Sequence, residues 1–296
     1  MVSTMTNQEK TKEALAKIEA AVENIRTNED WLQYLAFQAK FYRYSPRNVL
    51  LIRAQNPAAS FVKGYKAWHE LDRYVKKGAR GIAILAPCTR TIEVFKEPEN
   101  KTEYQDAEAE KVKKTILSGF RIVYVYDISS TDGSDAFLPV LVKGLSGDGE
   151  EERALYERLR AVISQEYTVK EVIGIAANGS AKGSYNRSTG IISIRGDLEA
   201  VQKCKTILHE LAHAEDFKLN PDDEDIPRNK RELIAESVAF VLSSRLGLDV
   251  SRYSTGYIKS WMKDENELIS VADTVQRVSA AIIDKLAQSE DFAFLI

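Results

Sequence analysis

Two of the chain's three histidines lie four residues apart, in the run His209-Glu210-Leu211-Ala212-His213. Positions i and i+4 of an α-helix share one face, so both imidazole rings can reach the same metal ion. Glu210 lies one residue around the helix, near enough to act on a metal-bound water without being a ligand. This pattern is typical of zinc-dependent peptide hydrolysis, and it predicts Zn²⁺ as the cofactor and Glu210 as the general base.

A catalytic zinc usually has three protein ligands and one open position, so a third ligand is required. Glu232 follows His213 by nineteen residues and belongs to the next predicted helix, with Glu236 one turn further on. Two antiparallel helices joined by a polar loop would return Glu232 to the histidines. We therefore predict His209, His213 and Glu232 as ligands, and Glu236 as a hydrogen-bond acceptor for a ligand imidazole N–H.

Alternatives to catalysis remain open at this point. The metal could simply hold two helices together, although structural sites usually have four protein ligands. Cys204 precedes His209 by more than one helical turn and is expected in the core. A group that stabilises the transition state could come from Tyr185, Tyr253 or Tyr257, each of which could equally be an ordinary surface or core residue. The segment 190–195 is either an edge strand that pairs with substrate or an internal strand.

The hydrophobic pattern predicts an α+β protein in two parts. In the first part we expect helices at 8–28, 30–42 (capped by Asp30) and after Pro46, strands at 59–66, 81–87 and 120–128, and a polar loop over 94–117. In the second we expect helices at 151–165, about 197–217, 230–246, 254–263 and 264–288, with strands at 171–176 and 190–195. Turn residues and an acidic run at 143–152 place the boundary between domains 1–145 and 146–296.

Composition narrows the classes of protein that fit. Hydrophobic residues make up 44% of the 296 positions and charged residues 29%, which is typical of a folded globular chain. The sequence has no apolar run long enough to span a membrane and no apolar leader, so we expect a cytoplasmic protein without a membrane partner. The two cysteines, Cys88 and Cys204, cannot form a disulfide framework.

A local excess of positive charge lies within this acidic chain. The formal net charge is −3, but residues 31–90 hold eleven Lys and Arg against two acidic residues, which leaves +9 there and −12 elsewhere. Aromatic residues alternate with these cations, a combination suited to single-stranded nucleic acid, whose bases stack while the cations meet phosphates. The other interpretation is an aromatic core beneath a basic solvated face. The contacts expected for DNA are Tyr42, Arg43, Tyr44, Arg47, Asn48, Arg53, Lys63, Lys66, Trp68, Arg73, Lys76, Lys77 and Arg80.

Several motifs in the first half resemble the N-terminal domain of ArdC-type antirestriction proteins. They are Tyr44 to Ile52, Gln55-Asn56-Pro57, Trp68 with Leu71, Arg73 and Val75, Lys77 to Ile82, Val125 to Ile128, Thr131-Asp132-Gly133 and Leu138-Pro139. In the second half, the histidine run, Glu232 to Glu236 and Tyr257 to Trp261 are similar to the metallopeptidase domain of that family and to ImmA/IrrE-type peptidases. The chain departs from the family pattern at Asp72, Tyr126 and Ser130.

The resemblance implies a single-stranded DNA-binding α+β domain followed by a mainly helical, zincin-like metallopeptidase domain with a small β-sheet. It also implies a protein of a mobile genetic element that guards incoming single-stranded DNA. Together with the metal motif, the first hypothesis is an antirestriction factor that is a gluzincin-like zinc peptidase, with a DNA-bound protein as its substrate. Two other hypotheses stay open: a non-catalytic protein that coats single strands and holds structural zinc, and a regulatory peptidase that cleaves a repressor.

Overall fold

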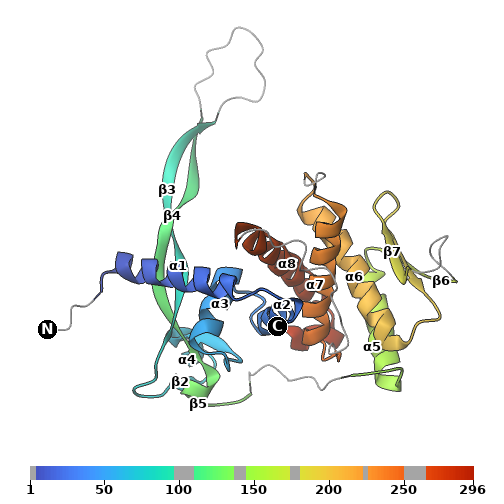
Figure 1. The fold of residues 1–296 in the computed structure, drawn as a ribbon, viewed down its shortest axis with the longest axis horizontal. Helices are drawn as coiled ribbons and strands as arrows, with labels where there is room; N and C mark the ends of the chain where they lie inside the picture. The colour runs from blue at the N-terminus through green and yellow to red at the C-terminus, as the bar shows by residue number, and fades with distance from the viewer. Residues whose placement is uncertain (1–4, 97–109, 137–144, 174–180, 223–225, 250–264) are drawn as a thin grey trace, which may run out of the picture.

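The computed structural model describes residues 5–96, 110–136, 145–173, 181–222, 226–249 and 265–296. It has mixed helix and sheet, as the hydrophobic pattern predicts. A long β-hairpin rises from one side of the molecule, and the three longest helices of the second half lie together on the other side (Figure 1). Within the described residues, no helix has both the length and the hydropathy that crossing a lipid bilayer requires.

Three helices open the chain: α1 (Asn7–Glu23), α2 (Asn28–Lys40) and α3 (Pro46–Gln55). Each begins at a hydroxyl residue whose side chain accepts a backbone N–H of the first turn, because those N–H groups have no partner within the helix. The cap of α2 is Thr27, and Asp30 completes a reciprocal capping box with it. The expectation that Asp30 itself occupies the N-cap position is therefore wrong by three residues.

The first sheet has the strand order β1-β4-β3 and is antiparallel throughout. Its strands are β1 (Val62–Gly64), β3 (Ile82–Lys96) and β4 (Glu110–Asp127). The expectation of a polar loop over 94–117 is wrong at both ends, because β3 continues to Lys96 and β4 already begins at Glu110. In the distal part of the hairpin the two strands pair only with each other, so both faces meet solvent. Such strands lack the alternation of apolar and polar residues by which a half-buried strand is recognised in a sequence.

A small second sheet closes the base of the hairpin. It pairs β2 (Arg73–Val75) with β5 (Thr131–Gly133), next to the short elements α4 (Tyr65–His69) and η1 (Ile128–Ser130). Asp72, one of the departures from the family pattern, has a φ of 53°. Glycine is favoured in this left-handed region and aspartate tolerates it, so Asp72 can take the place of a glycine without changing the turn.

The described part of the second half combines helices with a three-stranded sheet. Helix α5 (Glu150–Ile163) leads to the sheet β6-β8-β7, formed by β6 (Thr168–Val172), β7 (Gly183–Asn186) and β8 (Ile191–Arg195). Helices α6 (Ala200–Leu219), α7 (Arg228–Arg245) and α8 (Glu265–Leu286) follow, and η3 (Glu290–Leu295) ends the chain. The helix expected from about residue 197 begins at Ala200, with Glu199 at its N-cap. The helix expected at 254–263 lies outside the described residues.

One buried cluster of apolar side chains continues from the N-terminal helices into α7 and α8. Trp31 of α2 is buried, and its indole N–H donates to the Ser237 hydroxyl of α7 at 3.0 Å. The Gln276 amide of α8 donates to the Tyr42 carbonyl at 2.7 Å. The predicted boundary after residue 145 lies between β5 and α5, so α2 belongs by sequence to one half and packs on the other.

Candidate metal centre and nucleic-acid surface

Helices α6 and α7 bring the two predicted histidines and Glu232 to one point. The Nε2 atoms of His209 and His213 are 3.2 Å apart. Glu232 reaches them from α7, with its Oε2 3.4 Å from the His209 nitrogen and 3.6 Å from the His213 nitrogen. One ligand atom from each of the three residues lies within 4.8 Å of the other two. Among the described residues, this is the cluster of His, Cys, Asp and Glu side chains close enough together to hold a metal ion.

These three separations suit a tetrahedral metal site. Ligand atoms about 2.0–2.2 Å from a metal lie roughly 3.3–3.6 Å apart when the coordination is tetrahedral. The observed separations of 3.2, 3.4 and 3.6 Å therefore fit a divalent cation without movement of the helices. Three protein ligands also leave a fourth position open to water or substrate, as in catalytic sites.

Glu236 fixes the orientation of one imidazole. Its Oε2 is 3.2 Å from Nδ1 of His209, so the Nδ1–H can donate to the carboxylate and leave Nε2 for the metal. The Lys205 ammonium contacts the other carboxylate oxygen. Although burial favours its neutral form, the hydrogen bond from His209 and the charge of Lys205 lower the pKa of Glu236 to about 2, so it is anionic.

Electrostatics couple the ligands tightly in the metal-free chain. Burial alone would lower the pKa of His209, but hydrogen bonds to Glu232 and Glu236 raise it to about 9. The same hydrogen bonds from His209 and His213 hold the pKa of Glu232 far below its usual range. A cation bound here would replace the proton as the positive charge between these groups.

Glu210 lies beside the three ligands, on the side that faces β7. Its side chain is buried, which raises its pKa above the usual range and makes it a better proton acceptor, and the Tyr185 backbone N–H donates to it. A Cβ on Gly183 would lie 2.7 Å from Oε1 of Glu210 and 2.4 Å from Cγ2 of Thr206. Only a glycine allows the strand to approach α6 this closely.

A cavity of about 530 Å³ opens over these groups, between β7, α6 and α7. Tyr185 lines it, and its ring lies 6.5 Å from that of Phe217, whereas Tyr253 and Tyr257 lie outside the described residues. The segment 190–195 forms β8 in the middle of the sheet, so its interpretation as an edge strand is wrong. Strand β7, at one edge of this sheet, was not predicted because its Gly-Ser-rich sequence is typical of a turn.

The structure buries several residues that the sequence proposed as DNA contacts, which corrects that interpretation. Trp68 is fully buried and donates its indole N–H to the Tyr126 carbonyl at 2.9 Å. Arg73 is 6% exposed and donates to the Ser134 carbonyl at 2.8 Å. Asn48 and Tyr42 are also buried. These four side chains stabilise the fold, since their polar atoms satisfy backbone groups or their rings fill the core.

Other predicted contacts are engaged with α8 or half-buried. Arg43 pairs with Asp284 at 2.9 Å, and Arg47 lies 4.0 Å from Asp273. The Tyr44 hydroxyl donates to the Val62 carbonyl at 3.1 Å. The remaining predicted cations lie at the surface or partly so: Arg53, Lys63, Lys66, Lys76, Lys77 and Arg80.

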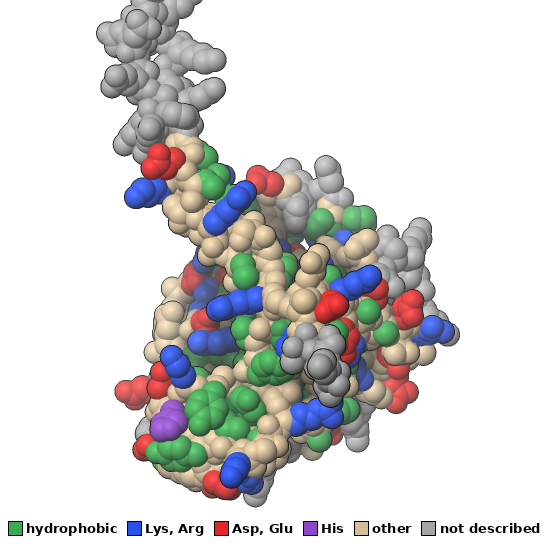
Figure 2. Space-filling view, turned by 90° about the vertical axis from the view of Figure 1, so that its left-hand side faces the viewer, with side chains coloured by type: hydrophobic (Ala, Val, Ile, Leu, Met, Phe, Trp, Pro, Cys, Tyr) green, Lys and Arg blue, Asp and Glu red, His purple; other side chains and the backbone are tan. Residues whose placement is uncertain are grey.

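Near these cations, aromatic rings are exposed. Tyr65, Tyr74 and Tyr124 are 57%, 51% and 48% exposed. The His69 ring meets that of Tyr74 edge-on at 4.5 Å and lies 6.4 Å from that of Tyr65. Figure 2 shows this face, where hydrophobic side chains gather beside a histidine with Lys and Arg around them. The expected contacts omit these tyrosines, because the sequence does not show which rings of an aromatic-rich segment are outside.

Comparisons with known proteins place the chain near ArdC. Residues 5–135 match the model of the N-terminal domain of the anti-restriction factor ArdC. The Mn(II)-bound structure of the antirestriction ArdC protein from the R388 plasmid superposes with a TM-score of 0.50 and 18% identity, over 94% of this chain and 98% of that one. This likeness establishes a shared fold.

The metal-free structure of the same ArdC protein superposes with a TM-score of 0.48 and 18% identity, over 83% of this chain and 86% of that one. A curated relative, the uncharacterized protein pXO2-81 of Bacillus anthracis, is 26% identical over 92% of this chain. The chain spans about half the length of that relative.

Proposed function

We propose that the chain is an antirestriction factor of the ArdC type that belongs to a mobile genetic element. In this proposal the first half, residues 1–145, binds single-stranded DNA, and the second half, residues 146–296, is a zincin-like metallopeptidase. The observation that carries the proposal is the spacing of three ligand atoms beside the buried Glu210, in a chain whose residues 5–135 match the ArdC N-terminal domain.

The residues around the cavity have distinct roles in this mechanism. His209, His213 and Glu232 would hold the cation, which supplies polarisation of the scissile carbonyl and acidification of water. Glu210 takes the proton from the attacking water and transfers it to the leaving amine. Its raised pKa favours both steps, because a carboxylate that is too acidic is a weak base and a poor proton carrier.

Strand β7 supplies the surface on which an extended peptide can lie. It is at the edge of its sheet and lines the cavity through Gly183 and Tyr185. An extended peptide can add to such an edge by main-chain hydrogen bonds, which would bring a peptide bond over the ligands. Among the described tyrosines, Tyr185 lines this cavity, and it is the proposed group for stabilising charge on the carbonyl oxygen.

The proposed metal is a divalent cation, with zinc favoured by the ligand set. Two imidazoles and one carboxylate suit zinc, but the same nitrogen and oxygen ligands also accept manganese. The structure of ArdC from R388 with Mn(II) supports a divalent metal in this fold. Metal content of the purified protein, measured by mass spectrometry after expression in rich and in manganese-supplemented medium, decides between them.

The DNA-binding half is tested with a labelled single strand and duplex competitor across a salt series. We expect tighter binding of the single strand, with an affinity that falls steeply as salt rises, because released counterions provide much of the binding free energy. Equal affinity for duplex, or no binding near 0.15 M salt, would contradict this half of the proposal.

Glu210→Gln separates catalysis from DNA coating. The variant keeps all three ligands, so metal content should equal that of the wild type, while transfer of unmodified DNA into a restricting host loses the protection that the wild type gives. Glu199→Gln, exposed at the start of α6, is the matched control. Full protection by Glu210→Gln would favour the non-catalytic protein that coats single strands. A single cleaved repressor together with no DNA affinity would favour the regulatory peptidase.

A further inference from the structure

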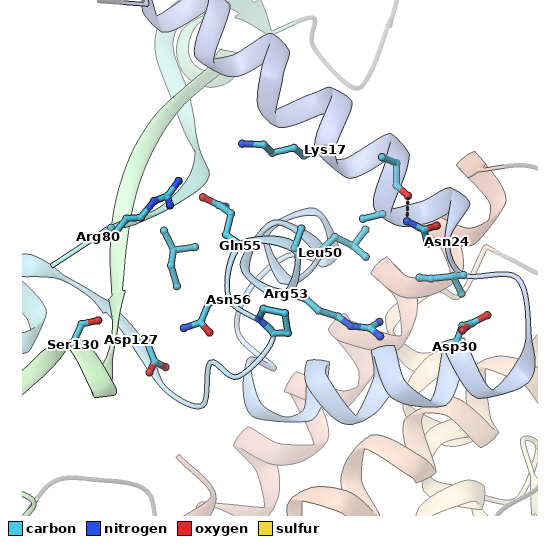
Figure 3. Close-up of a pocket in the computed structure, with 17 residues that line it drawn as sticks. Lys17, Asn24, Asp30, Leu50, Arg53, Gln55, Asn56, Arg80, Asp127 and Ser130 are labelled. Carbon is cyan, nitrogen blue, oxygen red and sulfur yellow. Dashed lines mark hydrogen bonds between the residues drawn. The ribbon is translucent and has the colours of Figure 1, made fainter.

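A second, larger cavity of about 970 Å³ lies between α1, α3 and the base of the β3–β4 hairpin. Its size is near the upper end of the roughly 300–1,000 Å³ that is common for ligand pockets. Figure 3 shows that its walls come from segments far apart in the sequence, with Lys17 on α1 and Asn24 at its C-terminal end, Arg53 and Gln55 on α3, and Arg80 just before β3. None of these features belongs to the metal centre.

Three cations border this cavity at separate places. Lys17 extends from α1 toward Arg80, whereas Arg53 extends along the opposite side toward Asp30 (Figure 3). Arg80 is exposed and makes no hydrogen bond or ion pair with any residue that the structure describes. Lys17 pairs with Glu13 at 2.7 Å, and Arg53 donates to Gln33 at 3.3 Å. Positive charge at both ends suits a chain of anionic groups better than one compact anion.

The two carboxylates of the lining already have partners on the backbone. Asp30 accepts from the N–H groups of Arg26 and Thr27, and Asp127 accepts from the N–H groups of Ser60 and Phe61. These bonds fix both carboxylates in the structural roles of a helix cap and a turn. The side chains of the cations can therefore turn toward an anion that enters the cavity, whereas the two carboxylates are held in place by their backbone partners.

The rest of the lining combines apolar side chains with four neutral polar ones, Asn24, Gln55, Asn56 and Ser130. Ala20, Ala21 and Ile25 form the α1 side, and Leu50 and Ala54 form the α3 side. No aromatic side chain of the described residues lines the cavity, so it offers no ring on which a base could stack. Small apolar side chains suit the sugar of a nucleotide, and the surrounding cations suit its phosphates.

The cavity also borders the exposed aromatic rings. Gly81 lines it, and a Cβ on Gly81 would lie 3.0 Å from Cβ of Tyr124 and 3.3 Å from Cζ of Tyr126. The Tyr126 ring is 6.4 Å from that of Tyr65. The end of the cavity at Arg80 and Gly81 therefore continues into the surface where rings are available for stacking.

We propose that this cavity holds the sugar–phosphate backbone of a DNA single strand, with phosphates at Lys17, Arg53 and Arg80 and bases directed outward to Tyr65 and Tyr124. This inference rests on the DNA-binding part of the proposed function and gives it a location. A flexible single strand can follow such a recess with one backbone, whereas the two backbones of a duplex lie on a rigid cylinder. Contacts to the backbone alone make the binding independent of base sequence.

Charge-removal variants measure the phosphate contacts. We expect Lys17→Gln, Arg53→Gln and Arg80→Gln each to weaken binding of labelled oligo(dT) by about three- to ten-fold at 0.15 M salt. Each should also reduce the slope of log affinity against log salt by about 0.7, the value for one contact to a single strand. Lys12→Gln, exposed on α1 outside the cavity, should change neither quantity.

Filling the cavity tests its location without changing charge. Ala20 and Ala54 are exposed residues of the lining, so Ala20→Trp or Ala54→Trp should occupy the cavity and weaken oligo(dT) binding at least ten-fold, with circular dichroism unchanged. Ala16→Trp, one turn earlier on an exposed face of α1, is the matched control and should bind like the wild type.

The outcomes separate the cavity from the proposed function. If the wild type binds oligo(dT) and the glutamine and tryptophan variants bind equally well, the strand lies elsewhere and the cavity proposal is overturned alone. If the wild type does not bind oligo(dT), both are overturned. A further measurement adds thymidine monophosphate at millimolar concentration as a competitor of oligo(dT). Efficient competition would assign the cavity to free nucleotides, whereas no competition together with weaker binding by the variants supports the strand.

Discussion

Two regions of the molecule place their functional side chains in opposite ways. One is the metal centre between α6 and α7. The other, called here the basic surface, lies around the base of the hairpin and consists of Lys63, Lys66, Lys76, Lys77 and Arg80 with the rings of Tyr65, Tyr74 and Tyr124. At the metal centre, the half-buried His209 and His213 contact Glu232 at close range, and Glu236 orients His209. On the basic surface, cations and rings are exposed or partly exposed and spread over several elements. Loss of one group should therefore be severe at the metal centre and mild on the surface, where many weak contacts add together.

The largest effect is expected for His213→Ala. It removes one of three ligands, so we expect metal affinity to fall by more than a hundred-fold and the purified variant to contain little metal. Isothermal titration with Zn²⁺ and metal analysis measure this. If this variant bound one equivalent of metal with wild-type affinity, the ligands would lie elsewhere. The contrast between a metal centre of few essential groups and a surface of many weak contacts would then be lost.

Glu236→Ala should have the next largest effect. It takes away the carboxylate that orients His209, and partners of this kind are worth about 10–100-fold in metal affinity. The same titration measures the loss, and Glu236→Gln should lie between the alanine variant and the wild type because its amide oxygen can still accept. An unchanged affinity would show that the imidazole is fixed by packing alone.

Asp127→Ala tests whether the first half also depends on a buried carboxylate. Burial favours the neutral form of Asp127, but hydrogen bonds from Ser129 and from the N–H groups of Ser60 and Phe61 lower its pKa below the usual value. We expect a loss of about 2 kcal/mol in unfolding free energy at pH 7, because the partly buried N–H groups of Ser60 and Phe61 lose a charged acceptor. Urea denaturation at several pH values measures it.

The sign of the pH dependence follows from the lowered pKa. Stability from Asp127 is present above the unfolded pKa of about 3.9 and is lost as pH falls through the lower folded pKa. The difference between wild type and Asp127→Ala should therefore shrink below about pH 4. A difference that stays constant to the lowest pH at which the chain folds would assign the loss to packing.

The smallest effects are expected for Lys77→Gln and Tyr74→Ala on the basic surface. Each removes one exposed group, so single-strand affinity should fall only about two- to five-fold, within the range of one phosphate contact or one weak stack. Fluorescence anisotropy with oligo(dT) measures both. A loss above a hundred-fold from either change would reveal a single dominant contact and contradict the distributed character of this surface.

Local spacing explains how much of the metal centre the sequence predicts. His209, Glu210 and His213 share a helix, so helical geometry alone places them. Glu232 comes from another helix, and its prediction as a ligand required the assumption that α7 runs antiparallel to α6. The approach of β7 to Glu210 was not predicted, because it depends on Gly183 meeting α6, a tertiary contact without a local signal.

The basic surface was harder to predict, because composition cannot assign each aromatic residue to the core or the exterior. Trp68 and Tyr65 lie three residues apart on one short helix, yet Trp68 is buried and Tyr65 is 57% exposed. The hairpin arm was missed for a related reason, since strands that face solvent on both sides lack an apolar face. The roles of the exposed cations in DNA binding stay predictions.

The contact of α2 with α7 has a consequence for how such chains can change over generations. Trp31 donates to Ser237 across the two sequence halves, and Arg245 of α7 donates to the carbonyl of Ala39 on α2 at 3.4 Å. A recombination event that joined a first half to a foreign second half would have to preserve both sides of this packing. The two halves should therefore be inherited together, and a hybrid gene should yield a folded protein only when its parents agree at these positions.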